Sequence, residues 1–304
     1  MLRKLRKLWA PALLLASTAA CAGGDGNLSI RLDGEEGARE GIPSVHSDGA
    51  GGEAEDIDFA DGWEIHFDRY LVSLNRLEIR DGSGNEGFAS NTTYVYDISS
   101  GTPEIELLSL PAQRWDQISF DISSPGEELT LDETVSEADA ESLRGANATY
   151  FIAGGAHHEA TGRELTFSFL VDAGAALSAC TNGEDDTQGV VVRPNATTEA
   201  SLTFHVEHLF FTDLASEGSD LRFEAMAAMA DENGHITMDD LANQSLADLR
   251  DADGNPLVDA TGSPVIYDPG GASLPSNDLA AFVREAVRTQ AHLNGGGLCT
   301  LSPL

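Results

Sequence analysis

Apolar and polar side chains alternate along about half of this 304-residue chain, and this two-residue period restricts the fold more than any other feature of the sequence. Between residues 57 and 211 the alternation returns in short runs, which turn-forming residues separate. Clear examples are Ile118 to Ile122, Leu165 to Val171 and Leu202 to Phe210. Such runs bury one side of each strand, so the pattern predicts eight or nine short strands packed as an antiparallel sandwich.

The longest alternating run, from Trp63 to Asp81, changes phase twice. The apolar side chains of residues 63–67 share one face, whereas the next apolar set starts at Tyr70 and the last at Leu77. A change of phase by one residue moves every following side chain to the other face of a strand. We therefore expect a β-bulge or a bend at each change.

The composition is that of a globular protein with a strong acidic excess. Hydrophobic residues make up 41% of the chain and charged residues 22%, so we expect a packed core. The 51 acidic residues outnumber 17 lysines and arginines, and the formal net charge is −34. A chain with this charge repels nucleic-acid phosphates and anionic bilayers, so we expect no nucleic-acid partner and no electrostatic binding to membranes.

Residues 1–20 predict a signal peptide. Four basic residues precede an apolar stretch from Leu8 to Ala16, which is too short to span a bilayer, and small residues follow. Thr18 to Cys21 resemble the lipobox of bacterial lipoproteins, although Thr18 stands where that family usually has leucine. The resemblance implies that Cys21 carries lipid and that Ala22 directs the protein to the outer membrane. The alternative is an ordinary signal peptide that is cleaved nearby.

Cysteine count predicts one disulfide bond. If Cys21 is lipidated, Cys180 and Cys299 remain as an even pair in an oxidising compartment. Their bond would close a long loop and fix the C-terminal tail to the middle of the chain. The alternative is two free thiols.

The order of patterns along the chain predicts its organisation. After a tether at residues 21–26, we expect a mainly β region at residues 27–212, an antiparallel β-sandwich of immunoglobulin or transthyretin type. Residues 33–56 are acidic and glycine-rich, so we expect them to form a loop without regular structure, with order resuming at Ile57. Residues 213–304 predict a small α-helical subdomain. Its three expected helices are Leu221 to Ala230, one capped by Thr237, and one capped by Ser276 that ends at Gly295.

Part of the β region resembles known lipoproteins. Residues 63–82 are followed by Leu110-Pro111-Ala112, Trp115 three residues further on, and Ile118. This order is similar to that of bacterial lipoprotein sandwiches, most of them uncharacterised, and to the MbnP family of periplasmic copper-binding proteins. The resemblance covers about 120 residues. It implies a copper-binding β protein but identifies none of its ligands in this chain.

Residues 229–240 resemble an EF-hand calcium loop, with Gly234 at its sharp turn. The predicted ligands are Asp231, Asn233, His235 through its carbonyl oxygen, and Asp240. Met229 supplies no carboxylate at the first position, and the twelfth position has aspartate where glutamate is usual, so the predicted calcium affinity is weak. The alternative is a helix–turn–helix in which Gly234 ends one helix and Thr237 caps the next.

Four of the eight histidines form two close pairs, His157 with His158 and His205 with His208. Imidazole is a good ligand for copper and zinc, and the segment around the second pair is otherwise apolar. We therefore expect His205 and His208 to face one copper or zinc site, with His157 or His158 from another strand as a further ligand. On a flat strand, positions three apart point to opposite faces, so the site would need a bulge. The alternative is that all four are ordinary polar strand residues.

Common enzyme motifs do not occur in the sequence. His158-Glu159 starts like a zinc-protease helix, but Gly162 stands where the second histidine would be. We therefore expect no enzyme, but a lipid-anchored, non-catalytic module that binds a metal or another ligand. The alternatives are a structural or adhesive surface lipoprotein without a small-molecule site and, third, a hydrolase. The sequence does not identify a protein partner.

Overall fold

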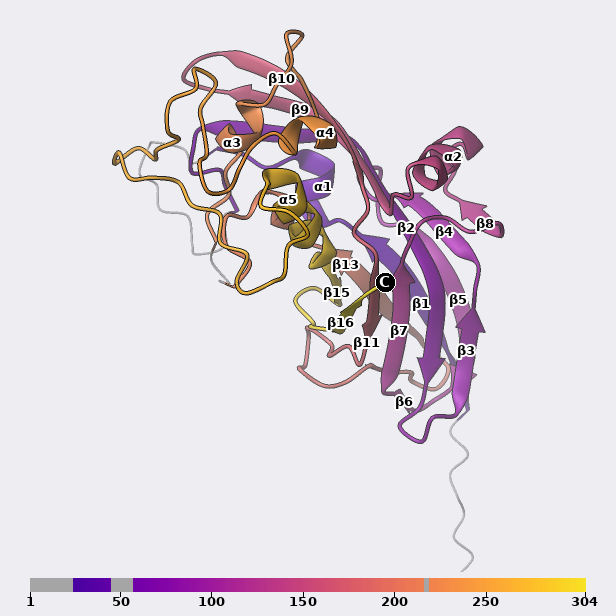
Figure 1. The fold of residues 1–304 in the computed structure, drawn as a ribbon. Helices are drawn as coiled ribbons and strands as arrows, with labels where there is room; N and C mark the ends of the chain where they lie inside the picture. Colours follow the sequence, from indigo (N-terminus) through magenta and orange to yellow (C-terminus); the bar gives the residue numbers. More distant parts are fainter. Residues whose placement is uncertain (1–23, 45–56, 216–218) are drawn as a thin grey trace, which may run out of the picture.

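The computed structural model describes residues 24–44, 57–215 and 219–304. The predicted signal peptide, the lipid site Cys21 and residues 45–56 of the predicted acidic loop lie outside the described residues. The described chain is mainly β, with a few short helices, and its two large sheets pack on a shared core (Figure 1). This confirms the predicted fold class.

The larger sheet has ten strands and is organised around the long strand β2 (Trp63–Arg80). Its main path runs β14 (His235–Thr237), β10 (Arg163–Val171), β9 (Tyr150–His158), β2, β7 (Gln117–Ile122), β11 (Ala175–Ser178) and β16 (Thr300–Pro303). Off this path lie β3 (Glu86–Ser90), β4 (Thr93–Asp97) and β8 (Leu129–Leu131). Because β2 has 18 residues, it pairs with four strands, β9, β7, β4 and β3.

The smaller sheet has four strands in the order β15 (Ala291–Leu293), β13 (Thr197–Phe204), β1 (Asp25–Asp33) and β5 (Glu104–Pro111). Strands β1 and β13 run parallel, in contrast to the antiparallel pairs on either side of them. A separate pair joins β6 (Arg114–Trp115) to β12 (Val190–Val191). Because β1 and β13 run parallel, both strands end at the same edge of the sheet, and the residues that follow them lie side by side there.

Both predicted phase changes in β2 are β-bulges. The pairing with β9 shifts register between Phe67 and Arg69, and the pairing with β7 shifts between Asn75 and Glu78. Gly154 lies opposite the first bulge, and a Cβ atom there would come within 2.0 Å of the carbonyl oxygen of His66. The bulged backbone therefore requires glycine at this position of β9.

The main core lies between the two sheets. Alternate residues of β2, such as Tyr70 and Val72, point into it, and the rings of Tyr150 in β9 and Phe204 in β13 meet across it at 6.4 Å. Leu71 points to the opposite face, where α2 (Glu137–Gly145) covers a second, smaller cluster. Helix α2 and β8 accordingly lie on the outer side of the larger sheet, away from α5 (Figure 1).

The N-terminal part is more ordered than the sequence predicts. Strand β1 starts at Asp25, inside the predicted tether, and helix α1 (Glu35–Glu40) follows it. Ile42 then forms a β-bridge with Ile65. The expectation of a loop from residue 33 to order at Ile57 is therefore wrong for residues 33–44. Ala38 and Ile42 are buried in the main core, which fixes a segment that has few apolar residues of its own.

The C-terminal helices are shorter than predicted. Residues 221–230 contain only the single turn α3 (Glu224–Ala227), and α4 (Met238–Leu241) is also one turn, although Thr237 forms the predicted capping box with Asp240. Helix α5 (Leu279–Arg288) is capped by Asp278, not by the predicted Ser276. It ends before Gly295 because residues 291–293 pair with β13 as strand β15. Strands β14, β15 and β16 all join sheets formed by the preceding part of the chain.

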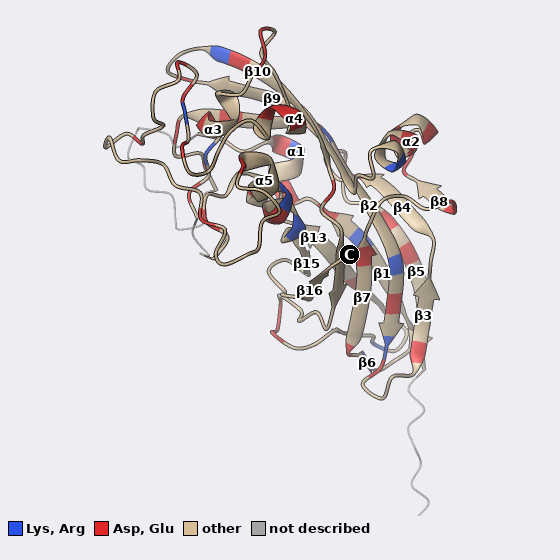
Figure 2. Ribbon diagram, viewed as in Figure 1, with Lys and Arg blue, Asp and Glu red and all other residues tan. Residues whose placement is uncertain are grey.

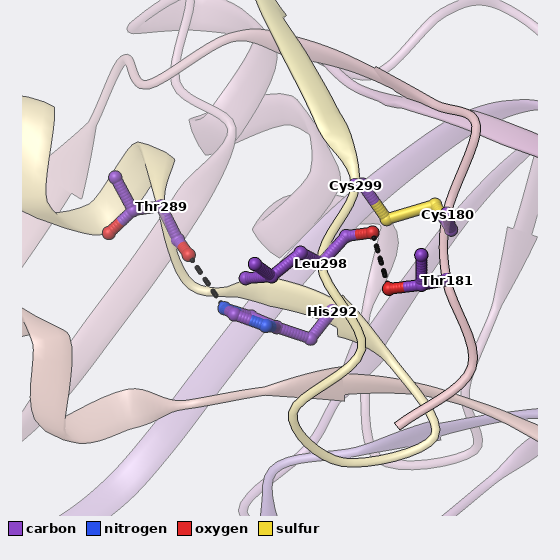
Figure 3. Close-up of a disulfide and its surroundings, with 6 residues drawn as sticks. All are labelled: Cys180, Thr181, Thr289, His292, Leu298 and Cys299. Carbon is purple, nitrogen blue, oxygen red and sulfur yellow. Dashed lines mark hydrogen bonds between the residues drawn. A yellow bond between two sulfur atoms is a disulfide. The ribbon is translucent and has the colours of Figure 1, made fainter. Parts of the chain in front are cut away.

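The predicted disulfide between Cys180 and Cys299 is present (Figure 3). Cys180 is completely buried. Beside the bond, the backbone N–H of Thr181 donates to the carbonyl oxygen of Leu298 at 2.8 Å, and β16 pairs with β11. The bond therefore attaches the C-terminal tail to the larger sheet, as the sequence predicts.

Acidic residues are spread over both sheets, the helices and the loops (Figure 2). The repulsion of the −34 charge is thus distributed over the molecule and not concentrated on one element. Among the helices of the described residues, none has the length and apolar character needed to cross a membrane.

Candidate metal centre

The segment that carries His205 and His208 is not the strand that its alternation predicts. Strand β13 ends at Phe204, and Val206–Phe210 form a 3₁₀-helix, η1. Residues three apart eclipse each other in a 3₁₀-helix, so the two histidines share one side without any bulge. Their rings stack with centroids 5.5 Å apart and planes 14° apart. The two histidines therefore converge by a different route from the predicted one.

A third histidine joins them from the end of the chain. Strand β15 pairs antiparallel with β13, and this places His292 opposite Thr203. The His292 ring meets the His205 ring edge-on, with centroids 4.5 Å apart, and lies 5.8 Å from that of His208. The sequence contains no local signal for this contact, because the partners are far apart along the chain.

The parallel pairing of β1 with β13 adds a carboxylate. Asp33 lies beside Thr203 in this register, so the residues that follow the two strands, Glu35 and His205, emerge at the same edge of the sheet. The Oε2 atom of Glu35 lies 3.2 Å from Nδ1 of His205. Gly37 permits the close approach of α1 to η1, because a Cβ atom there would lie 3.2 Å from a methyl group of Val206.

A second carboxylate comes from η1 itself. The Oε1 atom of Glu207 also lies 3.2 Å from Nδ1 of His205, and the side chain of Glu207 is only 11% exposed. Glu35, His205 and Glu207 thus place three ligand atoms within 4.8 Å of one another. Within the described residues, no other three side chains of the metal-binding types bring their ligand atoms so close together. We name it the Glu–His–Glu cluster.

Electrostatics assign different protonation states to the three histidines. Burial alone would lower the pKa of His205, but its hydrogen bonds to Glu207 and Glu35 and their negative charges outweigh burial and raise this pKa to about 10. Burial, followed by the positive charge on His205, lowers the pKa of His208 to about 3 and also lowers that of His292. At neutral pH the group therefore holds one imidazolium between two carboxylates, next to two neutral imidazoles.

Hydrogen bonds to Thr289 orient the two neutral rings. The Thr289 hydroxyl donates to the Ala286 carbonyl at 2.8 Å, so it accepts from Nδ1–H of His208, also at 2.8 Å. The Nε2–H of His292 donates to the Thr289 carbonyl oxygen at 3.1 Å (Figure 3). The other ring nitrogen, Nδ1, is buried, and the backbone of Gly296 also lies close enough to the ring to oppose the lowering of its pKa by burial. A neutral ring oriented by its other nitrogen is the form in which histidine binds metals.

The polar network continues into the core. The hydroxyl of Tyr70 donates to the side-chain oxygen of Gln290 at 2.7 Å, and the backbone N–H of His205 donates to the carbonyl of Gln290 at 3.0 Å. Gln290 is completely buried. The start of η1 is therefore held by backbone and side-chain bonds, which keeps His205 in place whether or not it is protonated.

The spacing of the cluster fits a small divalent ion. Zinc binds histidine nitrogen and carboxylate oxygen at about 2.0–2.2 Å, so neighbouring ligands of a tetrahedral ion lie about 3.4 Å apart. The nitrogen–oxygen distances of 3.2 Å around His205 are close to this value. Imidazole and carboxylate ligands together suit zinc, copper and other first-row transition metals. A metal ion would take the place of the proton on His205.

The other predicted histidine pair does not join this group. His157 and His158 are neighbours at the end of β9, and side chains alternate there. Nδ1 of His157 lies 2.7 Å from Oε1 of Glu164 at the surface, whereas the ring of His158 packs edge-on against Trp63 with centroids 5.0 Å apart. The prediction that these two histidines share a site with His205 and His208 is therefore not supported by their positions.

Three of the predicted calcium ligands, Asp231, Asp240 and the carbonyl oxygen of His235, accept hydrogen bonds within their own loop. The Asp231 carboxylate accepts from the backbone N–H groups of Asn233 and His235. The Asp240 carboxylate accepts from the N–H and the hydroxyl of Thr237, as a capping box requires. The His235 ring lies between the hydroxyls of two β10 residues, Thr166 and Ser168. Calcium binding by residues 229–240 stays a prediction, with these internal bonds competing against it.

The same turn occurs at three other places in the chain. Asp81, Asp251 and Asp259 each accept, like Asp231, from the backbone N–H groups two and four residues further on. In each case the residue three positions later is a glycine with positive φ, which L side chains rarely adopt. The EF-hand resemblance of residues 229–240 thus coincides with a turn that the chain uses repeatedly.

Comparison of the chain with protein-family models, with curated proteins and with solved structures finds no match. The geometry and charge of the cluster are therefore the observations from which a function is inferred.

Proposed function

We propose that this protein is a non-catalytic metal-binding lipoprotein that binds one divalent transition-metal ion at the Glu–His–Glu cluster. The supporting observation is that Nδ1 of His205 lies 3.2 Å from a carboxylate oxygen of both Glu35 and Glu207. His292, whose ring meets that of His205 with centroids 4.5 Å apart, would be the nearest further imidazole to the ion. The His205 and Glu207 side chains are 18% and 11% exposed, whereas that of Glu35 is 39% exposed, so the ion would be partly shielded from water and reached from the side of Glu35.

The ligand chemistry favours copper and zinc over calcium at this cluster. Calcium prefers six to eight oxygen ligands, whereas this cluster offers one or two nitrogens and two carboxylates. Among divalent ions, Cu²⁺ binds such mixed sites more tightly than Zn²⁺. We therefore expect both ions to bind, copper with the higher affinity. Copper is also the metal that the resemblance to the MbnP family implies.

The place of action is proposed from the first residues of the chain. The lipobox-like sequence at Thr18 to Cys21 supports export, lipidation of Cys21 and anchoring in the outer membrane. Replacement of Cys21 by serine should then move the protein from the membrane fraction to the soluble fraction. Retention of the Cys21→Ser protein in the membrane fraction would contradict the proposed anchor.

A structural role is the alternative that one observation favours. The imidazolium of His205 already pairs with both glutamates, so each carboxylate has a cationic partner without a metal ion. In that case the protein is a structural or adhesive surface lipoprotein, and the cluster is a buried ion pair. The two functions differ in whether a transition metal displaces the proton.

Titration calorimetry with Zn²⁺ and Cu²⁺ separates them. The mature protein should bind one equivalent of each ion, and Glu207→Gln should weaken binding by at least tenfold, because it removes a charged ligand. The matched control is Glu164→Gln, which removes the carboxylate of the exposed pair with His157. Equal affinities of wild type and Glu207→Gln would contradict the metal site and support the structural role.

A further inference from the structure

A cavity of about 340 Å³ lies away from the Glu–His–Glu cluster and shares no residue with it. It is bounded by Ala60 and Asp61 before β2, by His158 at the end of β9, by the start of α3, and by residues 257–265. Its volume is at the lower end of the range for small-molecule sites. The walls therefore come from four segments that lie far apart in the sequence, as is usual for a binding site.

Asp61 leaves one carboxylate oxygen without a partner in this cavity. Its Oδ2 accepts from the backbone N–H groups of Phe223 and Glu224, at 2.7 and 2.9 Å, and so caps α3 from another part of the chain. Its Oδ1 is buried and has no hydrogen-bond partner among the described residues. Burial raises the pKa of Asp61, and the two N–H groups oppose this rise. A buried, unpartnered oxygen is costly unless a ligand pairs with it.

Arg222 is the matching cation of the cavity. One of its terminal nitrogens bonds to Asp220 at 3.0 Å, and its side chain is 15% exposed. A guanidinium has five N–H donors in a planar fork, so most of them stay free for a ligand. The two carboxylate oxygens of Glu224, in contrast, already have partners, because one pairs with Trp63 and the other with Arg163. The cavity lining thus contains one buried carboxylate oxygen without a partner, that of Asp61, beside the guanidinium of Arg222 and the carboxylate of Asp259.

The remaining wall is mostly apolar. Leu257, Val258 and Val265 line it together with Asp259 and Ala260, and the three aliphatic residues flank two consecutive turns of the Asp-x-x-Gly kind, which begin at Asp251 and Asp259. Nδ1 of His158 is also buried and without a partner among the described residues. A ligand for this cavity would therefore have opposite charges close together and an apolar part.

We propose that the cavity binds a small zwitterion with an apolar side chain, the chemistry of the neutral aliphatic amino acids. The ammonium group would pair with Oδ1 of Asp61, and the carboxylate with the guanidinium of Arg222. The aliphatic side chain would pack on Leu257, Val258 and Val265. Nδ1 of His158 would supply one further hydrogen bond.

Ligands with a single charge fit the same groups less well. A simple amine would satisfy Asp61 but would leave the guanidinium of Arg222 beside another cation. A simple carboxylate would satisfy Arg222 but would leave Oδ1 of Asp61 unpaired and facing another anion. Because leaving a buried charge unpaired is costly, a zwitterion should bind more tightly than either half of it.

Calorimetry and thermal-shift assays with three related probes test this proposal on the mature protein. The probes are L-leucine, isoamylamine, which lacks the carboxylate, and 4-methylpentanoate, which lacks the amine. We expect L-leucine to bind at least about tenfold more tightly than either of the others, because each lacks a charged partner. Failure of L-leucine to bind at 10 mM, or equal binding of all three probes, would overturn the proposal.

Two variants locate the binding within the cavity. Asp61→Asn keeps an oxygen for the N–H groups of α3 and should weaken L-leucine binding at least tenfold, as should Arg222→Gln. The control is Arg250→Gln, because Arg250 also pairs with an aspartate two residues earlier but does not line the cavity. Melting temperatures of the variants verify folding. Unchanged L-leucine affinity in folded Asp61→Asn and Arg222→Gln would place the binding elsewhere and contradict the proposal.

Discussion

His205 is the residue that connects the metal site to pH. Its carboxylate neighbours raise its pKa from 6.5 to about 10, so at neutral pH the empty cluster carries a proton on the nitrogen that a metal would bind. A metal ion must displace this proton. Metal affinity should therefore rise with pH up to about 10. Above that pH, His205 is already deprotonated in the metal-free protein, so the metal no longer competes with a proton.

The expected result is the release of about one proton per Zn²⁺ bound at pH 7, with affinity rising about tenfold per pH unit between pH 6.5 and 8. Calorimetric titrations in two buffers with different heats of ionisation measure this release. His208 and His292 contribute little, because their lowered pKa values leave them neutral in this window. A titration that releases no proton would show that Zn²⁺ does not bind to His205.

Asp231 tests whether residues 229–240 form a calcium loop or only a turn. Asp251 makes the same two backbone hydrogen bonds in a turn for which no calcium site is predicted, so Asp251→Ala is its matched control. We expect Asp231→Ala and Asp251→Ala to lower the melting temperature to a similar extent, with or without 10 mM calcium, because each removes an acceptor of two backbone hydrogen bonds. Thermal melting measures this. A calcium-induced stabilisation that only Asp231→Ala abolishes would establish the calcium loop instead.

At the scale of elements, helix α5 tests how the C-terminal part is held. Asp278 caps it by accepting from the N–H of Ala281 at 2.9 Å, while the exposed Ser276 lies outside the helix. We expect Asp278→Ala to lower the free energy of unfolding by about 1 kcal/mol, and Ser276→Ala to change it by less than about 0.5 kcal/mol. Urea denaturation of both variants measures the difference. The opposite order would show that the helix starts at Ser276.

Elements with a regular period were predictable from the sequence, and irregular ones were not. The alternation and phase changes of residues 63–81 predicted β2 and both of its bulges, because side-chain direction alone decides them. The alternation around Phe204 to Phe210 predicted a longer strand, but η1 follows Phe204 directly. The backbone N–H of His205, at the start of η1, donates to the carbonyl of Gln290, a residue far along the chain that no local pattern indicates. Residues 33–44 carry few apolar side chains, and only contacts with distant strands give them order.

The candidate site shows the same limit. The sequence pointed to His205 and His208, and Glu207 could have been found as the charged residue between them in an apolar segment. It gave no signal for Glu35 or His292. Their contact with His205 depends on the parallel pairing of β1 with β13 and on the return of β15. Such pairings are properties of the sheet topology and not of any local pattern.

At the scale of the whole molecule, the disulfide decides how the C-terminal tail contributes to stability. The bond between Cys180 and Cys299 spans 119 residues, which corresponds to about 4–5 kcal/mol in the chain-entropy account. We expect the Cys180→Ala/Cys299→Ala protein to lose stability up to this amount in urea denaturation. Reduction of the wild type should lower stability by a similar amount and leave the double variant unaffected. An unchanged unfolding midpoint after reduction would contradict this role.

The acidic charge and the metal site also act at this scale. A net charge of −34 attracts divalent cations to the whole surface, so weak, non-specific metal binding is expected beside any specific site. Such binding is screened by salt, whereas binding in a partly buried cluster is screened less. Metal binding should therefore be measured at physiological salt or above.

The central claim is that a transition metal occupies the Glu–His–Glu cluster, and anomalous diffraction from crystals of the zinc-loaded mature protein tests it most directly. We expect one dominant zinc peak at about 2.0–2.2 Å from Nδ1 of His205 and from carboxylate oxygens of Glu35 and Glu207. The contrary result would be a zinc-saturated crystal in which His205 still makes both hydrogen bonds and the zinc peaks lie only on surface carboxylates.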